Sequence, residues 1–342
     1  MVDVFSPKER LIKALNKEKV DRNPVICPGG MMNAAIVDVM NTSGHKLPEA
    51  HHDSKLMAQL ASDVHEQTGF ENFGIPFCMT VEAEVLGSEI NYGTLECEPK
   101  IQKEVFPSVS QVEFKPLDSM SKNARVNTII QAGYELSRKF PDVPVIGNLT
   151  GPVSTAGSIV DPMRFLKELR KDKENAHKVM DYVADHLIEL AKLMIDNGAT
   201  MISMADPTAT GEILGPKMFD EYAVKYINKV VDAIHGMGVP AIVHICGNMN
   251  VVKDSVAKIR SNAISTDAFV SLKVLKNEFP QLTTMGNLST ISLQFADKDV
   301  IAKQTQKLVN DGIDIIAPAC GLSTSTPIGN IQAMTEVVRG GI

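Results

Sequence analysis

The sequence has no tryptophan and only five tyrosines and five cysteines, and no apolar run approaches the roughly 18–20 residues that span a bilayer. The shortage of aromatic side chains argues against an aromatic binding face, and seventeen methionines suit an adaptable core. An odd, scattered set of cysteines excludes the framework of a disulfide-rich secreted domain. We therefore expect a protein of the reducing cytoplasm with no membrane partner.

Clusters of lysine and arginine are also missing. The net charge is −7 and the pI is about 5.7, which argues against nucleic acid as a partner. Residues 1–20 are charged and amphipathic and lack the apolar core of a signal peptide. Apolar residues make up 44% of the chain, enough for a large core, and no segment has the composition of a linker. We expect one domain, residues 1–342.

The hydrophobic pattern alternates between short apolar runs and longer amphipathic stretches. The expected strands are Pro24–Cys27, Glu71–Pro76, Val143–Asn148, Met201–Ala205, Pro240–Cys246, Ala263–Thr266, Leu282–Gly286 and Ile313–Ala317. The expected helices between them are Ser54–Glu66, Lys122–Lys139, Pro162–Asp196, Pro216–Met237, Val251–Arg260, Lys298–Asn310 and Pro327–Val338. This alternation predicts an α/β fold, a (β/α)₈ TIM barrel; an open doubly wound sheet is the alternative, but it does not need so regular a pattern.

Two additions to the barrel are expected. Ser6-Pro7-Lys8-Glu9 has the form of a capping box with proline at the first helical position, which predicts an N-terminal helical extension to about Asn16. The segment Ser88–Val105 predicts a β-hairpin inserted after the second strand.

The chemistry is concentrated where the expected strands end. His244 and Cys246 are two apart on one strand, so their side chains point to the same side, and Cys320 follows the last strand. One imidazole and two thiols are ligands that zinc prefers, and a three-ligand set leaves a fourth position open, as in catalytic sites. Since catalytic groups of such barrels lie at the carboxyl ends of the strands, Asp206 and Asp267 are expected at the same rim.

Each of these residues alone has an ordinary structural explanation. A cysteine at a strand end is typically a small buried hydrophobe, and Cys27, Cys78 and Cys97 have no ligand at metal spacing. Ser323 and Thr324 belong to a run of small and hydroxyl residues that leads into a helix starting with proline. This run is either a flexible loop or, through unpaired backbone N–H groups, a cradle for an anionic end of the substrate.

Several longer segments carry a resemblance to a known family. They are Val20-Asp21-Arg22-Asn23-Pro24-Val25, Leu86-Gly87-Ser88-Glu89-Ile90-Asn91, Gly147-Asn148-Leu149-Thr150-Gly151-Pro152, Met204-Ala205-Asp206-Pro207, Val243-His244-Ile245-Cys246-Gly247-Asn248 and Ala317-Pro318-Ala319-Cys320-Gly321. Over essentially its whole length the chain resembles the uroporphyrinogen decarboxylase superfamily and, within it, the methylcobamide:coenzyme M methyltransferases.

The resemblance implies a zinc-dependent methyltransferase. It places the catalytic Zn²⁺ ligands on His244, Cys246 and Cys320, and an acidic residue that can fill the fourth position on Asp267. The implied reaction moves a methyl group from a methylcobamide, carried by a corrinoid-binding protein, to a small thiol, coenzyme M. From position alone, Asp206 and Asn248 are candidates for contacts with the cofactor or substrate, and Ser323 and Thr324 for binding the sulfonate.

The decarboxylase branch fits this chain poorly. The loop of residues 27–35 lacks the basic residue expected to grip tetrapyrrole carboxylates, and Cys78 stands where the resemblance places an acid. Decarboxylation is therefore not expected. Methyl transfer to tetrahydrofolate or to another thiol remains open, as does a non-catalytic role as a partner of a corrinoid protein.

Overall fold

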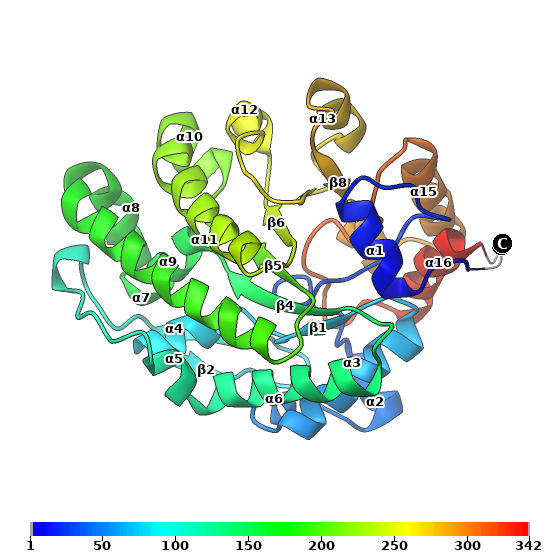
Figure 1. Cartoon of the computed structure of the whole chain (residues 1–342), viewed down its shortest axis with the longest axis horizontal. Coiled ribbons are helices and arrows are strands. Elements are labelled where there is room, and N and C mark those ends of the chain that lie inside the picture. The colour runs from blue at the N-terminus through cyan, green and yellow to red at the C-terminus, as the bar shows by residue number, and fades with distance from the viewer. Residues whose placement is uncertain (1–2, 341–342) are drawn as a thin grey trace.

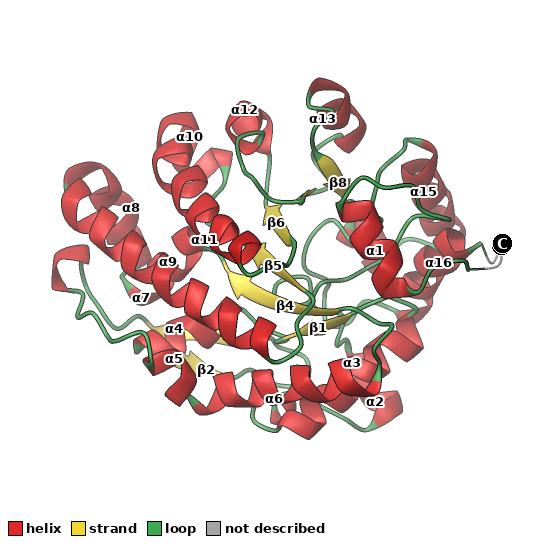
Figure 2. Ribbon diagram, in the orientation of Figure 1, coloured by secondary structure: helices red, strands yellow, loops and turns green. Residues whose placement is uncertain are grey.

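The computed structural model describes residues 3–340, and a parallel sheet lies at its centre, surrounded by helices (Figures 1 and 2). The strand order is β1-β4-β5-β6-β7-β8. The bounds are β1 Phe73–Ile75, β4 Val145–Thr150, β5 Met201–Ala205, β6 Ala241–Ile245, β7 Ala263–Thr266 and β8 Thr283–Met285. The residues of β4 to β8 are all buried, as in parallel strands covered on both faces.

Two further segments close the sheet into a barrel. Val25 forms a parallel bridge with Ile316, and Ile315 forms one with Met285 of β8. On the other side the Glu71 amide donates to the Val25 carbonyl, 2.9 Å away, which joins the first expected strand to the segment leading into β1. The (β/α)₈ barrel is therefore confirmed, with its first and last strands reduced to isolated bridges.

The helices are α1 Pro7–Leu15, α2 Val37–Ser43, α3 Ser54–Thr68, α4 Val81–Leu86, α5 Ser119–Lys122, α6 Ala124–Lys139, α7 Pro152–Ile159, α8 Pro162–Lys171, α9 Lys173–Asp196, α10 Gly211–Met218, α11 Lys225–Gly236, α12 Lys253–Val256, α13 Leu272–Glu278, α14 Thr290–Phe295, α15 Lys298–Asn310 and α16 Ile328–Arg339. Short 3₁₀ turns occur at Glu49–His51, Val109–Gln111 and Met249–Val252, the last called η4, and a π-helical turn at Phe219–Val224.

Both expected additions are confirmed. In α1 the Ser6 hydroxyl accepts from the Glu9 amide, and the Glu9 carboxylate accepts from the Ser6 amide, which is a complete capping box. The hairpin consists of the antiparallel strands β2 (Glu89–Asn91) and β3 (Lys100–Lys103).

A buried ion network ties α1 to the barrel. The guanidinium of Arg10, which is fully buried, contacts Glu71 at 2.9 Å and Asp21 at 2.8 Å. Arg22 contacts the same Glu71 carboxylate at 2.6 Å, and the second oxygen of Glu71 accepts from the Val25 amide. Because these charges have good partners, the network fixes where the first barrel segment enters the sheet.

Three helices differ from the expected ones. The stretch Pro162–Asp196 is two helices, because Asp172 between them caps α9. The stretch Pro216–Met237 is interrupted: Gly215 has φ 65°, and the π-helical turn separates α10 from α11. The helix expected at Val251–Arg260 is shortened to η4 and the four-residue α12.

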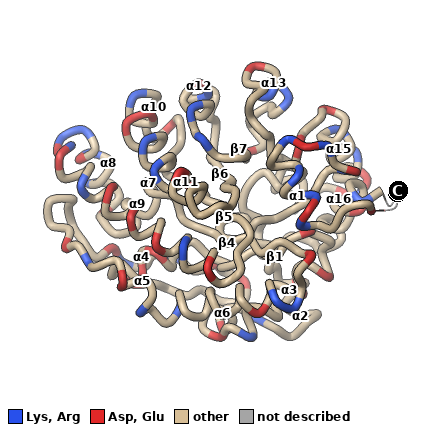
Figure 3. Tube along the Cα trace, in the orientation of Figure 1, with Lys and Arg blue, Asp and Glu red and all other residues tan. Residues whose placement is uncertain are grey.

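Charges of both signs are interspersed on the outer helices (Figure 3), with no large field of one sign on the face shown. Among the helices of residues 3–340, none is long and apolar enough to cross a membrane.

Candidate metal centre

Three side chains converge where β6 ends and the closing segment of the barrel ends. The Nε2 atom of His244 lies 3.2 Å from the Sγ atom of Cys246, and Cys246 Sγ lies 3.8 Å from Cys320 Sγ. Within residues 3–340, these form the one group of three or more His, Cys, Asp or Glu side chains whose donor atoms all lie within 4.8 Å of one another. Residues distant in sequence thus meet at one point of the rim.

This donor set fits a zinc ion. The two sulfurs are too far apart for a disulfide, whose S–S bond is about 2 Å. Two sulfurs bound to zinc at about 2.3 Å in tetrahedral geometry would be about 3.8 Å apart, which is the observed separation. The Nδ1 atom of His244 lies 2.9 Å from the hydroxyl of Ser265 on β7, and this contact orients Nε2 toward the sulfurs.

The two thiols differ in acidity. The hydrogen bond with Cys246, assisted by His244, lowers the pKa of Cys320 to about 5. The pKa of Cys246 is raised by its bond with Cys320, by burial, and by the charges of Asp267 and Asp206. A lowered pKa at Cys320 favours its thiolate form, and the thiolate is the form of cysteine that binds metal ions.

The backbone turns sharply after Cys246. Gly247 has φ 67°, a left-handed conformation that favours glycine, and a Cβ atom there would lie 3.0 Å from the carboxylate of Glu212. The same carboxylate accepts from the Asn248 amide at 2.9 Å, and the Asn248 side chain caps η4 by accepting from the Asn250 amide. Asn248 thus shapes the turn that carries Cys246, and its expected contact with a cofactor or substrate stays a prediction.

Asp267 lies after β7, outside the three-residue cluster. Its charge is near enough to raise the pKa of Cys246, and its backbone carbonyl accepts from the Asn287 side chain at 2.8 Å. Its role as a fourth ligand stays a prediction.

The carboxylate of Asp206 accepts hydrogen bonds from the start of α7. Its carboxylate is fully buried and accepts from the Val153 and Ser154 amides and from the Ser154 hydroxyl, at 2.9, 2.8 and 2.6 Å. These donors belong to the first turn of α7, so Asp206 anchors that helix. Gly151 is required there, because a Cβ atom would lie 2.4 Å from the Cβ atom of Asp206.

The hydroxyls of the loop after Cys320 also have partners. Thr324 donates to the Glu96 carbonyl at the tip of the hairpin, 2.7 Å away, and the hydroxyls of Ser323 and Ser325 are 3.0 Å apart. The Thr324 hydrogen bond thus joins the loop to the hairpin. Sulfonate binding by Ser323 and Thr324 stays a prediction.

Sequence reasoning missed Glu82 on α4. Its side chain is buried, and its two oxygens accept from the amide and the hydroxyl of Thr150, at 2.7 and 3.0 Å. Burial raises its pKa to about 7, against hydrogen bonds from Thr150 that lower it. No spacing rule links residues 68 positions apart, so only the fold shows this carboxyl at the end of β4.

Glu82 predicts a specific pH dependence of stability. Its pKa is higher in the folded protein, about 7, than its ordinary 4.5, so the folded state holds the proton more tightly. The contribution of Glu82 to the free energy of unfolding is fully present below pH 4.5. It is lost as the pH rises through 7, by up to about 3 kcal/mol. The free energy of unfolding is measured by urea titration for the wild type and for Glu82→Gln. As the pH increases from 5 to 8, the value for Glu82→Gln should rise relative to the value for the wild type. A constant difference over that range would refute the raised pKa.

Arg125 of α6 is a second feature that the sequence did not reveal. Its guanidinium is buried, donates to Cys78 Sγ at 3.0 Å and pairs with Glu84 of α4. Cys78, for which the sequence suggested only packing, therefore accepts a charged hydrogen bond. The Arg125 guanidinium is thus already paired with Glu84.

A (β/α)₈ barrel with a His-Cys-Cys donor set at the carboxyl ends of its strands defines a barrel enzyme with a candidate metal centre. The uroporphyrinogen decarboxylase (URO-D) family model matches residues 6–341, and the chain belongs to this family.

Comparison with individual proteins places the chain among the methyltransferases. It is 34% identical to the methylcobamide:CoM methyltransferase MtbA of Methanosarcina acetivorans, over 98% of both chains. It is 29% identical to the methylcobamide:CoM methyltransferase MtaA of Methanosarcina barkeri, over 96% of both. A solved methyltransferase from Methanosarcina mazei superposes with a TM-score of 0.91 at 30% identity, over 98% of this chain and 99% of that one. The protein is a methyltransferase.

Proposed function

We propose that this protein, acting as a single domain in the cytoplasm, moves a methyl group from a methylated corrinoid on a partner protein to the thiol of coenzyme M. The convergence of His244, Cys246 and Cys320 at the barrel rim is the observation that carries the proposal. The named methyltransferases with similar sequences support the donor and the acceptor.

The proposal assigns the candidate metal centre to thiol activation. A zinc ion held by His244, Cys246 and Cys320 would supply Lewis acidity that favours a thiolate over a thiol near neutral pH. The two cysteine ligands provide negative charge, which keeps the bound sulfur nucleophilic, and Ser265 holds the imidazole in place. Asp267 is proposed to occupy the fourth position until substrate arrives.

The chain's other residues shape the place where the reaction occurs. Met31 lies against the centre, with its Sδ atom 3.5 Å from Cys246 Sγ, and supplies an apolar wall. Asp206 fixes α7 beside β5, and Gly247 turns the chain away after Cys246. In the proposed reaction a sulfur–carbon bond forms, the cobalt–carbon bond breaks, and its electron pair stays on cobalt as Co(I).

A direct assay tests the acceptor. The purified zinc-loaded protein is incubated with free methylcobalamin and, in separate reactions, with coenzyme M, other small thiols or tetrahydrofolate, while cob(I)alamin is followed by absorption. We expect the fastest appearance with coenzyme M. A faster reaction with tetrahydrofolate would identify tetrahydrofolate, and not coenzyme M, as the acceptor. The absence of a reaction with any acceptor would refute methyl transfer from a corrinoid.

A further inference from the structure

Met31 belongs to the loop after the first barrel segment and lies against the candidate metal centre. Its Sδ atom is 3.5 Å from Cys246 Sγ, which is van der Waals contact. Its backbone carbonyl faces the residue after the other cysteine, because a Cβ atom on Gly321 would lie 2.8 Å from that oxygen. Met31 therefore contacts both segments that carry the cysteines of the centre, those of Cys246 and Cys320.

A tight turn fixes Met31 in this position. The Gly29 amide donates to the Met32 carbonyl at 3.1 Å, and the Met32 amide donates to the Gly29 carbonyl at 2.9 Å, so Gly30 and Met31 form the apex. Gly30 has φ 57°, a conformation that favours glycine, and its amide donates to the Pro76 carbonyl at 2.8 Å, just after β1. The turn is thus joined to the barrel, and the Met31 side chain is presented from a defined backbone.

The residues of the centre differ in how far they face solvent. His244 is 1% exposed and Cys246 is 8% exposed, whereas Cys320 and Met31 are both partly exposed. A small molecule that comes from solvent therefore reaches the donor atoms on the side of Cys320 and Met31. The thioether lies beside the path of an incoming ligand.

The chemistry of the Met31 side chain differs from that of a polar neighbour. A thioether has no hydrogen to donate and accepts hydrogen bonds only weakly, so it holds water poorly. It is also polarizable, and it makes favourable dispersion contacts with another sulfur atom. Because the apolar surroundings of a metal control the access of solvent, such a neighbour distinguishes a thiol from water without using charge.

We propose that Met31 is a specificity-determining residue for the thiol acceptor, and that its side chain contacts the substrate sulfur at the open position of the centre. This inference rests on the proposed function. The contact favours a small thiol over water at that position, since the thiol sulfur is as soft as the thioether beside it. The proton of the thiol leaves to the solvent as its sulfur binds.

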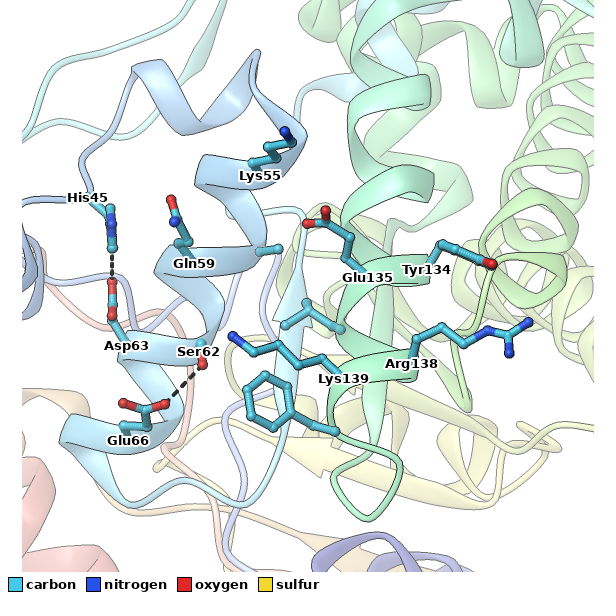
Figure 4. Close-up of a pocket in the computed structure, with 13 residues that line it drawn as sticks. His45, Lys55, Gln59, Ser62, Asp63, Glu66, Tyr134, Glu135, Arg138 and Lys139 are labelled. Atoms are coloured by element: carbon cyan, nitrogen blue, oxygen red, sulfur yellow. Dashed lines mark hydrogen bonds and ion pairs between the residues drawn. The ribbon is translucent and has the colours of Figure 1, made fainter.

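A groove of about 680 Å³ between α3 and α6, on the outside of the barrel, does not offer this chemistry (Figure 4). Among residues 3–340, no cysteine or methionine lines it, and its walls carry charges of both signs. The Nδ1 atom of His45 lies 2.6 Å from the Asp63 carboxylate on one of these walls. The proposed contact with sulfur therefore belongs to the metal centre and not to this groove.

The test measures thiol binding directly, in the cobalt-substituted protein. The dissociation constant of coenzyme M is taken from the absorption change for the wild type, Met31→Gln, Met31→Ala and Met31→Leu. The control is Met163→Gln, which changes a methionine that is 66% exposed on α8. Because water competes for the same position, this constant reports the selection of sulfur over water.

We expect Met31→Gln and Met31→Ala to raise the dissociation constant at least about fivefold, close to the effect of one buried methylene group. Met31→Leu keeps the volume and the apolar character, so it should stay within about twofold of the wild type, as should the control. Without thiol, every variant should keep the wild-type spectrum, since Met31 is not a ligand of the ion.

The other outcomes are distinct. Unchanged dissociation constants in Met31→Gln and Met31→Ala overturn the role of Met31 while leaving the proposed function in place. A changed spectrum of Met31→Gln without thiol assigns Met31 to the support of the ligand set and also overturns the inference. If the spectrum of the wild-type protein changes with no thiol, the proposed function itself fails.

Discussion

Cys246→Ala and Cys320→Ala are each expected to lose bound zinc and thiol-dependent turnover. Each substitution removes one sulfur of a pair that is 3.8 Å apart and leaves His244 with a single thiolate partner. Removing an outer partner of a metal ligand typically costs about 10–100-fold in affinity or activity, so removing a ligand should exceed about 100-fold. Metal analysis after dialysis and turnover with methylcobalamin and coenzyme M are the measurements.

The controls separate ligand loss from misfolding. Both cysteine variants should keep the far-ultraviolet circular dichroism of the wild type, since each change removes one sulfur atom from the rim. Asp267→Ala is the matched variant of a rim residue outside the three-atom cluster, and it should retain most of its zinc. Complete loss of metal in Asp267→Ala would make that carboxylate an obligatory ligand. Normal zinc and turnover in either cysteine variant would refute the zinc assignment.

Asp206→Ala is expected to destabilise the barrel by several kcal/mol, because each buried donor left without an acceptor costs about 1–3 kcal/mol. The substitution leaves two backbone N–H groups of α7 and the Ser154 hydroxyl without their buried acceptor. Burial raises the pKa of Asp206, and the hydrogen bonds from Ser154 and Val153 oppose that shift, so the site depends on these donors.

Urea unfolding of Asp206→Ala and Asp206→Asn measures this effect. The asparagine amide keeps one oxygen acceptor, so Asp206→Asn should lose less free energy of unfolding than Asp206→Ala. A loss below about 1 kcal/mol in Asp206→Ala would show that α7 is anchored by other contacts.

The sequence predicted the features that depend on local pattern. The capping box at Ser6 and Glu9 needs only a spacing of three, and the convergence of His244 and Cys246 needs only the two-residue period of a strand. The alternation of strands and helices indicated barrel closure, and closure places Cys320 beside Cys246. The first strand is reduced to one bridge, between Val25 and Ile316, but its apolar residues were still enough to predict it from the sequence.

The remaining features depend on contacts between distant segments. Glu82 meets Thr150, and Arg125 meets Cys78, only because β1, β4 and α6 pack together. The sequence pointed to Asp206 as a rim residue but could not show that α7 begins within its reach. The breaks near Asp172 and Gly215 interrupt continuous amphipathic patterns, so periodicity alone overestimated the lengths of those helices.

The most direct test of the central hypothesis is the absorption spectrum of the cobalt-substituted protein with and without coenzyme M. If His244, Cys246 and Cys320 hold one divalent ion with a position open to a thiol, the spectrum should show sulfur-to-cobalt charge transfer that intensifies when the thiol is added. A spectrum that does not change on adding the thiol would contradict thiol activation at this centre.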